Sequence, residues 1–387
     1  MTNFQSKNNQ LFVNNINLLV LIVIGVCLSC SVAADMSSHL FKSEGMNIKV
    51  EKLFDGLKIP WGMAFVSETK LLVTEREGDI LLLDIAKSTK KILKNSPNVM
   101  AEGQGGMLDI VLSPNYKTTG WIYFTYVKEI DGEGATVLAR AQLKKDQFYN
   151  WQELLITEST TDTSRHFGSR IAFDNKGHVF FGVGDRGERP NGQDLTNHAG
   201  SIIRLNLDGS VPKDNPFINN NTVLPEIWSY GHRNPQGLAY DVNNNRLWEI
   251  EHGPRGGDEI NLIMAGLNYG WPIISYGKEY WGPLAVGEGT HRKGMEQPVK
   301  VYVPSIAPGS LLIYSGNAFP KWKGNLFSGA LKLRHINRIV LNREGMVIKE
   351  ERLLESLDDR IRALAQNSHG WLYFSTDSGG IYRIQPK

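Results

Sequence analysis

One pattern recurs along this chain of 387 residues and limits its possible folds more than any other feature. An apolar pair is followed by a polar turn rich in Asn, Asp, Gly or Pro, and then by a short strand-like run. Six copies begin at Ala64-Phe65, Val111-Leu112, Ala172-Phe173, Ala239-Tyr240, Leu312-Ile313 and Leu364-Ala365. The copies lie about 60 residues apart on average, so six of them account for nearly all of the chain after residue 34.

These runs carry aromatic and β-branched residues between glycine-bearing turns, which is typical of β-hairpins. An all-β chain of this length must protect its sheet edges, and blades arranged radially around a central channel do so within one domain. The sequence therefore predicts a single domain over residues 35–387, folded as a six-bladed β-propeller of four-stranded antiparallel blades. A β-helix or a pair of β-sandwiches is the alternative, but the chain shows neither a hexapeptide period nor a dividing linker.

The first 34 residues differ from the rest. Lys7 is the only charged residue before Asp35, and an apolar run from Leu18 to Leu28 precedes the small residues that end at Ala34. This pattern predicts a secretory signal peptide over residues 1–34, cleaved after Ala34, and export to the periplasm. The alternative is a membrane anchor, either uncleaved or lipidated on one of the two cysteines of this segment, although the apolar run is shorter than the roughly 20 residues of a membrane span.

The overall composition excludes two classes of protein. Lys and Arg together number 42 and Asp and Glu 40, so the chain lacks the basic character of a dedicated nucleic-acid binder. Hydrophobic residues make up 41% of the chain, which excludes a disordered protein.

Two segments before and after the third predicted hairpin carry a candidate acid–base pair. His166 stands in the run 165–170, directly before an apolar strand, and a histidine there can act as a general base because it is mostly neutral at pH 7. Asp185 stands in the glycine-rich run 182–187 and could orient His166 or cap a turn. An ordinary loop histidine and an ordinary turn are the alternatives.

The next candidate segments, 231–237 and 252–261, hold glycines and prolines among polar residues. Such residues fix the backbone, so that carbonyl groups could converge on a hard cation, with Asp258 or Glu259 supplying charge; Ca²⁺ accepts such mixed oxygen ligands. A simple turn is the alternative. Further on, Arg360 and Arg362 share one face if their segment is a strand, and two neighbouring cations need either solvent or an anion.

Together these motifs resemble the soluble dehydrogenases of glucose and other aldoses that depend on pyrroloquinoline quinone (PQQ), and most closely the bacterial aldose sugar dehydrogenases. The resemblance runs from about Val50 to Ile384 and is carried by specific motifs. They are Gly-Gln-Gly-Gly at 103–106, the histidine motif at 166, Gly-Asp-Arg-Gly at 184–187, Arg-Leu-Asn-Leu-Asp-Gly-Ser at 204–210, Gly-His-Arg-Asn-Pro-Gln-Gly at 231–237, Gly-Gly-Asp-Glu-Ile-Asn-Leu at 256–262 and Asn-Tyr-Gly-Trp-Pro at 268–272.

The resemblance implies roles for individual residues. His166 is expected to accept the proton, with Asp185 holding it. The residues expected to contact PQQ are Gln104, Arg233, Asn234, Tyr280, Lys332, Arg360 and Arg362. The carbonyls of Gly253 and Pro254 are expected to hold a calcium ion against the cofactor, and Glu259 and Tyr269 look like ligands of a further calcium.

The implied reaction is oxidation of an aldose at its anomeric carbon to a lactone, with hydride passing to PQQ and electrons leaving to an external acceptor that the sequence does not identify. Glucose-specific relatives carry glutamine where His252 stands and tryptophan where Val303 aligns, which favours a broader sugar site here. Three carboxylates on PQQ require several cations, and the Arg and Lys candidates meet that requirement. A monomer or a homodimer is expected.

Two other functions fit a propeller. A non-catalytic propeller that binds protein or carbohydrate has no reason to keep a base beside a cationic pocket. A calcium-dependent lactonase would instead place several carboxylates along the channel.

Overall fold

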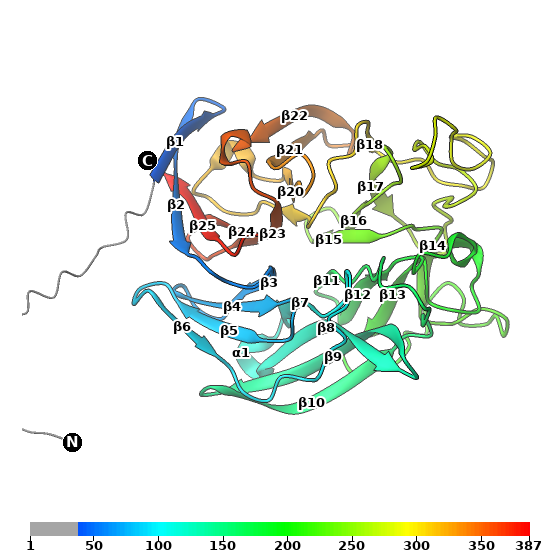
Figure 1. The fold of residues 1–387 in the computed structure, drawn as a ribbon, viewed down its shortest axis with the longest axis horizontal. Coiled ribbons are helices and arrows are strands. Elements are labelled where there is room, and N and C mark those ends of the chain that lie inside the picture. The colour runs from blue at the N-terminus through cyan, green and yellow to red at the C-terminus, as the bar shows by residue number, and fades with distance from the viewer. Residues whose placement is uncertain (1–37) are drawn as a thin grey trace, which may run out of the picture. The chain divides into compact units, whose positions relative to one another are not determined.

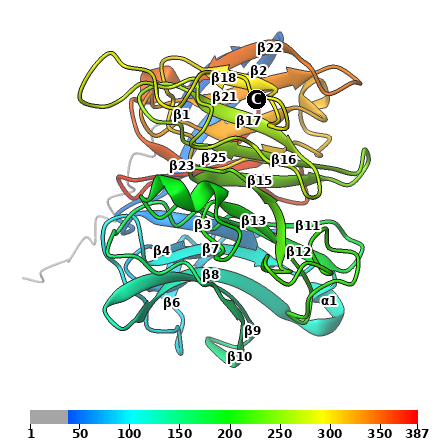
Figure 2. The ribbon, with the colours of Figure 1, turned by 90° about the vertical axis from the view of Figure 1, so that its right-hand side faces the viewer.

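The computed structural model describes residues 38–387, so the predicted signal peptide lies outside the described residues. The described chain forms six antiparallel sheets around a common centre, five with four strands and one with five (Figure 1). This confirms the predicted six-bladed β-propeller. In Figure 2, the segments coloured light blue to green lie on one side of the centre. Those coloured yellow-green to red lie on the other side, together with the dark blue strands at the start of the described chain.

The first three blades follow one another along the chain. Blade 1 consists of β3 (Pro60–Phe65), β4 (Lys70–Glu75), β5 (Ile80–Asp84) and β6 (Thr89–Ile92). Blade 2 consists of β7 (Met107–Leu112), β8 (Trp121–Ile130), β9 (Glu133–Lys144) and β10 (Gln147–Ile156), with the short helix α1 (Tyr116–Thr119) between β7 and β8. Blade 3 consists of β11 (Ile171–Phe173), β12 (His178–Val183), β13 (Ser201–Asn206) and β14 (Ile227–Tyr230).

The last three blades complete the ring. Blade 4 consists of β15 (Pro235–Asp241), β16 (Arg246–Glu251), β17 (Asp258–Ile263) and β18 (Lys300–Tyr302). Blade 5 consists of β19 (Leu312–Ile313), β20 (Leu326–Gly329), β21 (Ile336–Leu341) and β22 (Val347–Leu353). Blade 6 consists of β23 (Ile361–Gln366), β24 (Leu372–Thr376) and β25 (Ile381–Pro386), joined by β2 (Met46–Phe54) and β1 (Ser38–Ser43). Each of the six predicted hairpins is the first pair of strands of one blade.

Blade 6 closes the ring by joining the two ends of the described chain. β2 pairs antiparallel with β25, with Val50 opposite Ile384. Ile48 and Val50 are buried in one apolar cluster with Phe374 and Ile384. This closing strand has no counterpart in the sequence repeat, because it comes from the chain before the first copy.

The first strands of neighbouring blades contact one another and surround the channel. Buried Arg170, just before β11, lies at their meeting point and forms an ion pair with Asp109 of blade 2 (2.9 Å). Its guanidinium carbon lies 3.9 Å from the ring centre of Trp61 in blade 1.

Arg170 also reaches the remaining blades. It donates hydrogen bonds to the carbonyls of Gln236 (3.3 Å) in blade 4, Gly309 (2.6 Å) before blade 5 and Arg362 (3.5 Å) in blade 6. One side chain at the start of blade 3 therefore contacts four other blades and the loop that leads into blade 5.

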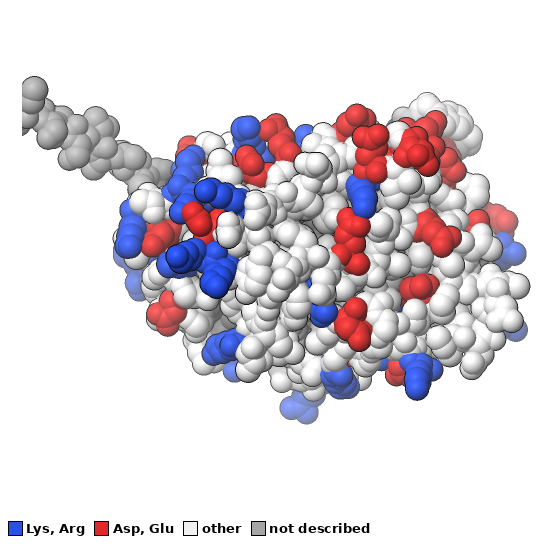
Figure 3. All heavy atoms as spheres, turned by 90° about the horizontal axis from the view of Figure 1, so that it is seen from below, with Lys and Arg blue, Asp and Glu red and all other residues white. Residues whose placement is uncertain are grey.

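The described surface carries charges of both signs. On the face shown in Figure 3, acidic and basic side chains are interspersed. Among the described residues, no helix has both the length and the apolar character needed to cross a bilayer.

Candidate active site

Three adjoining cavities at one end of the channel contain nearly all of the predicted site residues. The histidine cavity, of about 340 Å³, is lined by Gln104, Arg165, His166, Asp185, Gly187, Arg189, Arg233, Pro254, Trp271 and Tyr280. The arginine cavity, of about 220 Å³, is lined by Ile59, Trp61, Arg76, Gln104, Phe167, Gly168, Asn234, Gln236, His252, Leu331, Arg360, Arg362 and Asp377. The glutamate cavity, much smaller, is lined by Arg233, Glu251, His252, Gly253, Pro254, Gly257, Glu259, Tyr269, Trp271, Ile274 and Ser275. Shared lining residues show that the three cavities are neighbours.

The structure brings His166 and Asp185 together. Nδ1 of His166 lies 2.6 Å from Oδ1 of Asp185, and both side chains are buried. His166 has a left-handed backbone (φ 58°), a conformation that costs energy for a residue with a side chain, and Oε1 of Gln104 accepts a hydrogen bond from its N–H (2.8 Å). The neighbouring backbone at Gly184 comes so close that a Cβ there would lie 2.3 Å from the His166 carbonyl oxygen. A side chain at position 184 would therefore clash, which explains the glycine that begins the motif at 184–187.

Two further groups fix Asp185. Its Oδ1 accepts a hydrogen bond from the Gly187 N–H and its Oδ2 accepts one from Nε1 of Trp271, each at 2.8 Å. Because Asp185 occupies Nδ1, Nε2 is the ring nitrogen of His166 that remains to face the cavity.

The electrostatics of the pair favour a neutral imidazole. Burial lowers the pKa of His166 below its usual value, and the charge of Arg233 acts in the same direction against the raising effect of Asp185. Burial alone would raise the pKa of Asp185, but the hydrogen bond with His166 and the charge of Arg233 outweigh it and hold that pKa below its usual value. His166 is therefore a neutral base beside an ionised carboxylate at neutral pH.

In the arginine cavity, Arg360 and Arg362 share a protein anion that the sequence reading missed. Nε of Arg360 donates to Asp377 (2.8 Å), and Arg362 donates to both of its oxygens (2.5 and 2.9 Å). The register of the β23–β24 hairpin, with Ile361 opposite Thr376, puts Asp377 beside this pair. Knowing that register would have revealed it.

Asn234 lies between the cavities and the centre. Its Oδ1 accepts hydrogen bonds from the Gly168 N–H and from Nε2 of Gln236, each at 3.3 Å. Its buried Nδ2 has no partner among the described residues. A buried N–H₂ group beside a cavity is an unused donor for a ligand.

Arg233 contacts the carbonyls of the predicted calcium loop. Its Nη1 donates to the carbonyls of His252 (3.0 Å) and Gly253 (2.8 Å). The carbonyl of Pro254 accepts a hydrogen bond from the Ser305 hydroxyl (3.3 Å). A carbonyl oxygen has two lone pairs, so these contacts leave one on each of Gly253 and Pro254.

Glu259 and Tyr269 both line the glutamate cavity. The Tyr269 hydroxyl already donates to the Leu262 carbonyl (2.6 Å) and accepts from the Met264 N–H (2.9 Å). A ligand role for Tyr269 therefore falls to its backbone carbonyl. Burial and the charge of Glu251, which lies opposite on β16, raise the pKa of Glu259 well above its usual value.

Two of the residues predicted to contact the cofactor are exposed, unlike the buried residues described above. Tyr280 lines the histidine cavity although 65% of it is exposed. Lys332 is exposed and lines none of the three cavities, whereas its neighbour Leu331 lines the arginine cavity. Sequence reasoning also gave no role to Trp271, whose motif it had singled out, or to Arg165 and Arg189 beside His166.

Fold and site together describe a propeller enzyme with a buried His–Asp pair beside a cationic cavity. A family model for "Glucose / Sorbosone dehydrogenase" matches residues 57–383. The chain therefore belongs to this family of oxidoreductases, which confirms the resemblance drawn from the motifs.

Individual relatives agree with this assignment. The chain is 38% identical over 363 residues to aldose sugar dehydrogenase YliI of Escherichia coli K12, covering 91% of this chain and 96% of the relative. The crystal structure of the soluble E. coli aldose sugar dehydrogenase in its apo form has a TM-score of 0.84 at 37% identity, covering 88% of this chain and 100% of that one. The PQQ-bound aldose sugar dehydrogenase of Streptomyces coelicolor has a TM-score of 0.73 at 26% identity, covering 92% and 99%.

Proposed function

We propose that this protein is a quinoprotein aldose sugar dehydrogenase, which uses PQQ and Ca²⁺ to oxidise the anomeric carbon of an aldose to the lactone. The observation that carries the proposal is the His166–Asp185 pair, which opens on a cavity that shares Gln104 with the arginine cavity. A proton acceptor and a site for a multiply charged anion thus lie side by side.

The charges of the lining residues fit PQQ. The arginine cavity has three arginines against one carboxylate, Asp377, and the histidine cavity has three arginines against Asp185. Each guanidinium has five N–H donors, so Arg360 and Arg362 keep donors beyond those that Asp377 uses. With the unpaired donor of Asn234, these groups would hold the three carboxylates of PQQ. A lactonase would need the opposite charge in this channel.

When bound, PQQ supplies the hydride acceptor and Ca²⁺ supplies a Lewis acid beside it. The protein supplies the base: Nε2 of His166 takes the proton of the anomeric hydroxyl as the substrate C–H bond breaks. Asp185 keeps the other proton on Nδ1 and stabilises the imidazolium that forms, while Trp271 and Gly187 keep Asp185 in place. The electrons then leave to an external acceptor.

Calcium would be held by backbone oxygen atoms. The carbonyls of Gly253 and Pro254 are at hand for the ion beside the cofactor, and Glu259 with the Tyr269 carbonyl for a further ion. A carboxylate whose pKa is raised by burial, as at Glu259, gains most from a bound cation.

A broad substrate range fits the residues at positions 252 and 303, where this chain differs from the glucose-specific relatives. Val303 is 70% exposed and presents a small side chain. The His252 ring nitrogen Nε2 donates to the Pro308 carbonyl (2.7 Å), and burial lowers its pKa to about 3, so this histidine is neutral. We expect dye reduction with several aldoses, and activity with glucose alone would contradict this.

Reconstitution tests the proposed reaction. Purified protein supplied with PQQ and Ca²⁺ should reduce a dye in the presence of an aldose, and should lose activity without PQQ or with Ca²⁺ chelated. His166→Ala should retain PQQ and lower kcat/KM by about 10² to 10⁴-fold. His178→Ala is the matched control, because His178 has the same 2.6 Å contact between Nδ1 and an aspartate, Asp174, away from the cavities. Full turnover in His166→Ala would contradict the proposal.

We further propose that residues 1–34 are a cleaved signal peptide and that the enzyme, a monomer or homodimer, works in the periplasm. Amino-terminal sequencing of the protein from the periplasmic fraction should begin after Ala34. A start at Met1 in the membrane fraction would favour the anchored alternative.

A further inference from the structure

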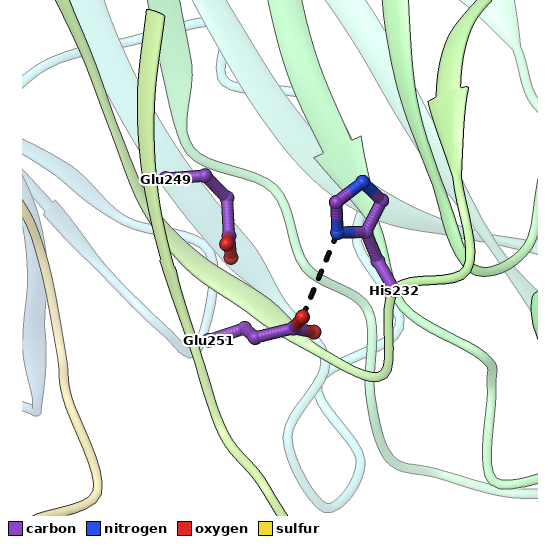
Figure 4. A group of neighbouring side chains, drawn as sticks. All are labelled: His232, Glu249 and Glu251. Carbon is purple, nitrogen blue, oxygen red and sulfur yellow. Dashed lines mark ion pairs between the residues drawn. The ribbon is translucent and has the colours of Figure 1, made fainter. Parts of the chain in front are cut away.

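Three buried side chains converge beside the glutamate cavity, in blade 4 and in the loop that leads into it (Figure 4). His232 comes from the loop between β14 and β15, and Glu249 and Glu251 come from the same face of β16. One ligand atom of each lies within 4.8 Å of those of the other two. His232 and Glu249 are 0% exposed and Glu251 is 4% exposed.

On two of these side chains, one polar atom forms a hydrogen bond within the protein and the other has no hydrogen-bond partner among the described residues. Nε2 of His232 lies 2.9 Å from the Ser229 hydroxyl, whereas its Nδ1 has no hydrogen-bond partner among the described residues. Oε2 of Glu249 accepts a hydrogen bond from Nδ2 of Asn261 (3.0 Å), whereas Oε1 has none within the described chain. Metal-binding histidines and carboxylates are held in this way by second partners.

Glu251 follows the same pattern. Its Oε2 accepts hydrogen bonds from the backbone N–H groups of Arg233 (2.6 Å) and Asn234 (3.1 Å). Its Oε1 accepts only a long hydrogen bond from Nδ2 of Asn261 (3.5 Å). The same oxygen lies 3.6 Å from Nδ1 of His232, too far for a hydrogen bond. Two ligand atoms of a tetrahedral metal with bonds of about 2.1 Å lie about 3.4 Å apart, so this pair is already close to a ligand spacing.

The charge of the cluster is uncompensated. Within residues 38–387, no Lys or Arg side chain forms an ion pair with Glu249 or Glu251. Two buried carboxylates without a partner cation are unfavourable. A bound cation would remove this cost and satisfy the unpartnered atoms together.

We propose that His232, Glu249 and Glu251 bind a divalent first-row transition-metal cation, Zn²⁺ or Mn²⁺. An imidazole nitrogen with two carboxylates suits these cations, whereas Ca²⁺ takes six to eight oxygen ligands. The site adjoins the position proposed for the further calcium, because Glu251 also lines the glutamate cavity and lies opposite Glu259. It differs from that position in using His232 and Glu249, and it does not depend on the proposed reaction.

The cation has a structural role. Because Glu251 binds the N–H groups of Arg233 and Asn234, the metal ties the loop that bears these two residues to the end of β16. The chain continues from that end directly into His252, Gly253 and Pro254. The metal therefore braces the base of the site without contacting a substrate.

Metal binding by the full chain tests the proposal. The protein is stripped with a chelator, transferred to buffer with excess Ca²⁺ so that calcium sites are filled, and titrated with ZnCl₂ or MnCl₂. We expect one equivalent of Zn²⁺ or Mn²⁺ to bind, and the affinity to fall by more than about 100-fold in Glu249→Gln and by about 10-fold in Ser229→Ala. Glu226→Gln is the matched control, because Oε2 of Glu226 likewise lies 3.6 Å from a buried histidine nitrogen, that of His198, without a second carboxylate.

Anomalous diffraction from wild-type crystals grown with Zn²⁺ or Mn²⁺ keeps the test decisive if Glu249→Gln does not fold. A peak between His232 and Glu251 supports the proposal. Binding of Ca²⁺ alone, binding that Glu249→Gln retains, or an anomalous peak elsewhere would overturn it.

Discussion

At the scale of single residues, the surroundings of a histidine decide what it can do. His166 and His178 each have Nδ1 2.6 Å from an aspartate oxygen. Burial and Arg233 lower the pKa of His166, and its second nitrogen faces a cavity. His178 instead lies beside Arg204, whose Nη2 is 3.1 Å from its Nε2, and lines none of the three cavities.

Replacing Asp185 should shift the pH dependence of the reaction in a defined direction. Asp185 raises the pKa of His166, so Asp185→Asn lowers it further below the usual value of about 6.5. The acid limb of kcat/KM, which reports protonation of the base, should therefore move to lower pH, while the plateau falls by up to about 10⁴-fold because the tautomer is no longer fixed. Asp174→Asn is the control and should leave the pH profile in place. A limb that moves to higher pH would refute the assignment of His166.

The sequence predicted much of this site because its motifs keep reacting groups close along the chain. His166 and Asp185 lie on either side of one hairpin, so the sequence alone indicates that their side chains could meet. Asp377 and Trp271 could not, because their partners depend on strand register and on contact between blades 3 and 4. The burial of Glu249 could not be predicted for another reason. Its position on β16 is next to apolar residues, and this pattern is typical of an ordinary strand.

At the scale of elements, the strand that closes the ring is the least predictable part of the fold. The repeat located the first hairpin of every blade, since apolar strands around a tight turn are local. β2 pairs with β25 across nearly the whole sequence, and no local pattern encodes that choice.

The closing strand should contribute strongly to stability. Ile48→Ala removes a side chain that is 0% exposed in the cluster of blade 6, and we expect a loss of about 2–5 kcal/mol in the free energy of unfolding. Ile348→Ala on β22 makes the same chemical change where the side chain is 65% exposed, and should cost less than about 0.5 kcal/mol. Denaturant unfolding measures both, and equal losses would show that β2 is not part of the core.

At the scale of the whole molecule, Arg170 connects the blades. Arg170→Met would leave Asp109 as a buried carboxylate without its cation. It would also remove contacts to four other blades and to the loop before blade 5. We expect a loss of about 3–5 kcal/mol in the free energy of unfolding. Part of it should return in the double variant Arg170→Met, Asp109→Leu, because the unpaired carboxylate is then removed.

A surface arginine provides the comparison. Arg140 also lies over an aromatic ring, that of Trp121 at 4.3 Å, and bonds Gln152 and the Leu207 carbonyl. Arg140→Met should cost about 1 kcal/mol or less in denaturant unfolding. If Arg170→Met and Arg140→Met lower the free energy of unfolding by the same amount, the central position of Arg170 does not add to stability.

The Arg170–Asp109 pair has a kinetic consequence. It separates the arginine cavity from a second cavity at the other end of the channel, which Arg170, Asp109 and the far ends of the innermost strands line. A molecule that reaches His166 from the arginine cavity therefore does not pass through this second cavity. Under the proposed function, the lactone leaves before the electron acceptor binds at the same place. Plots of rate against sugar at several acceptor concentrations should then give the parallel double-reciprocal lines of a ping-pong enzyme.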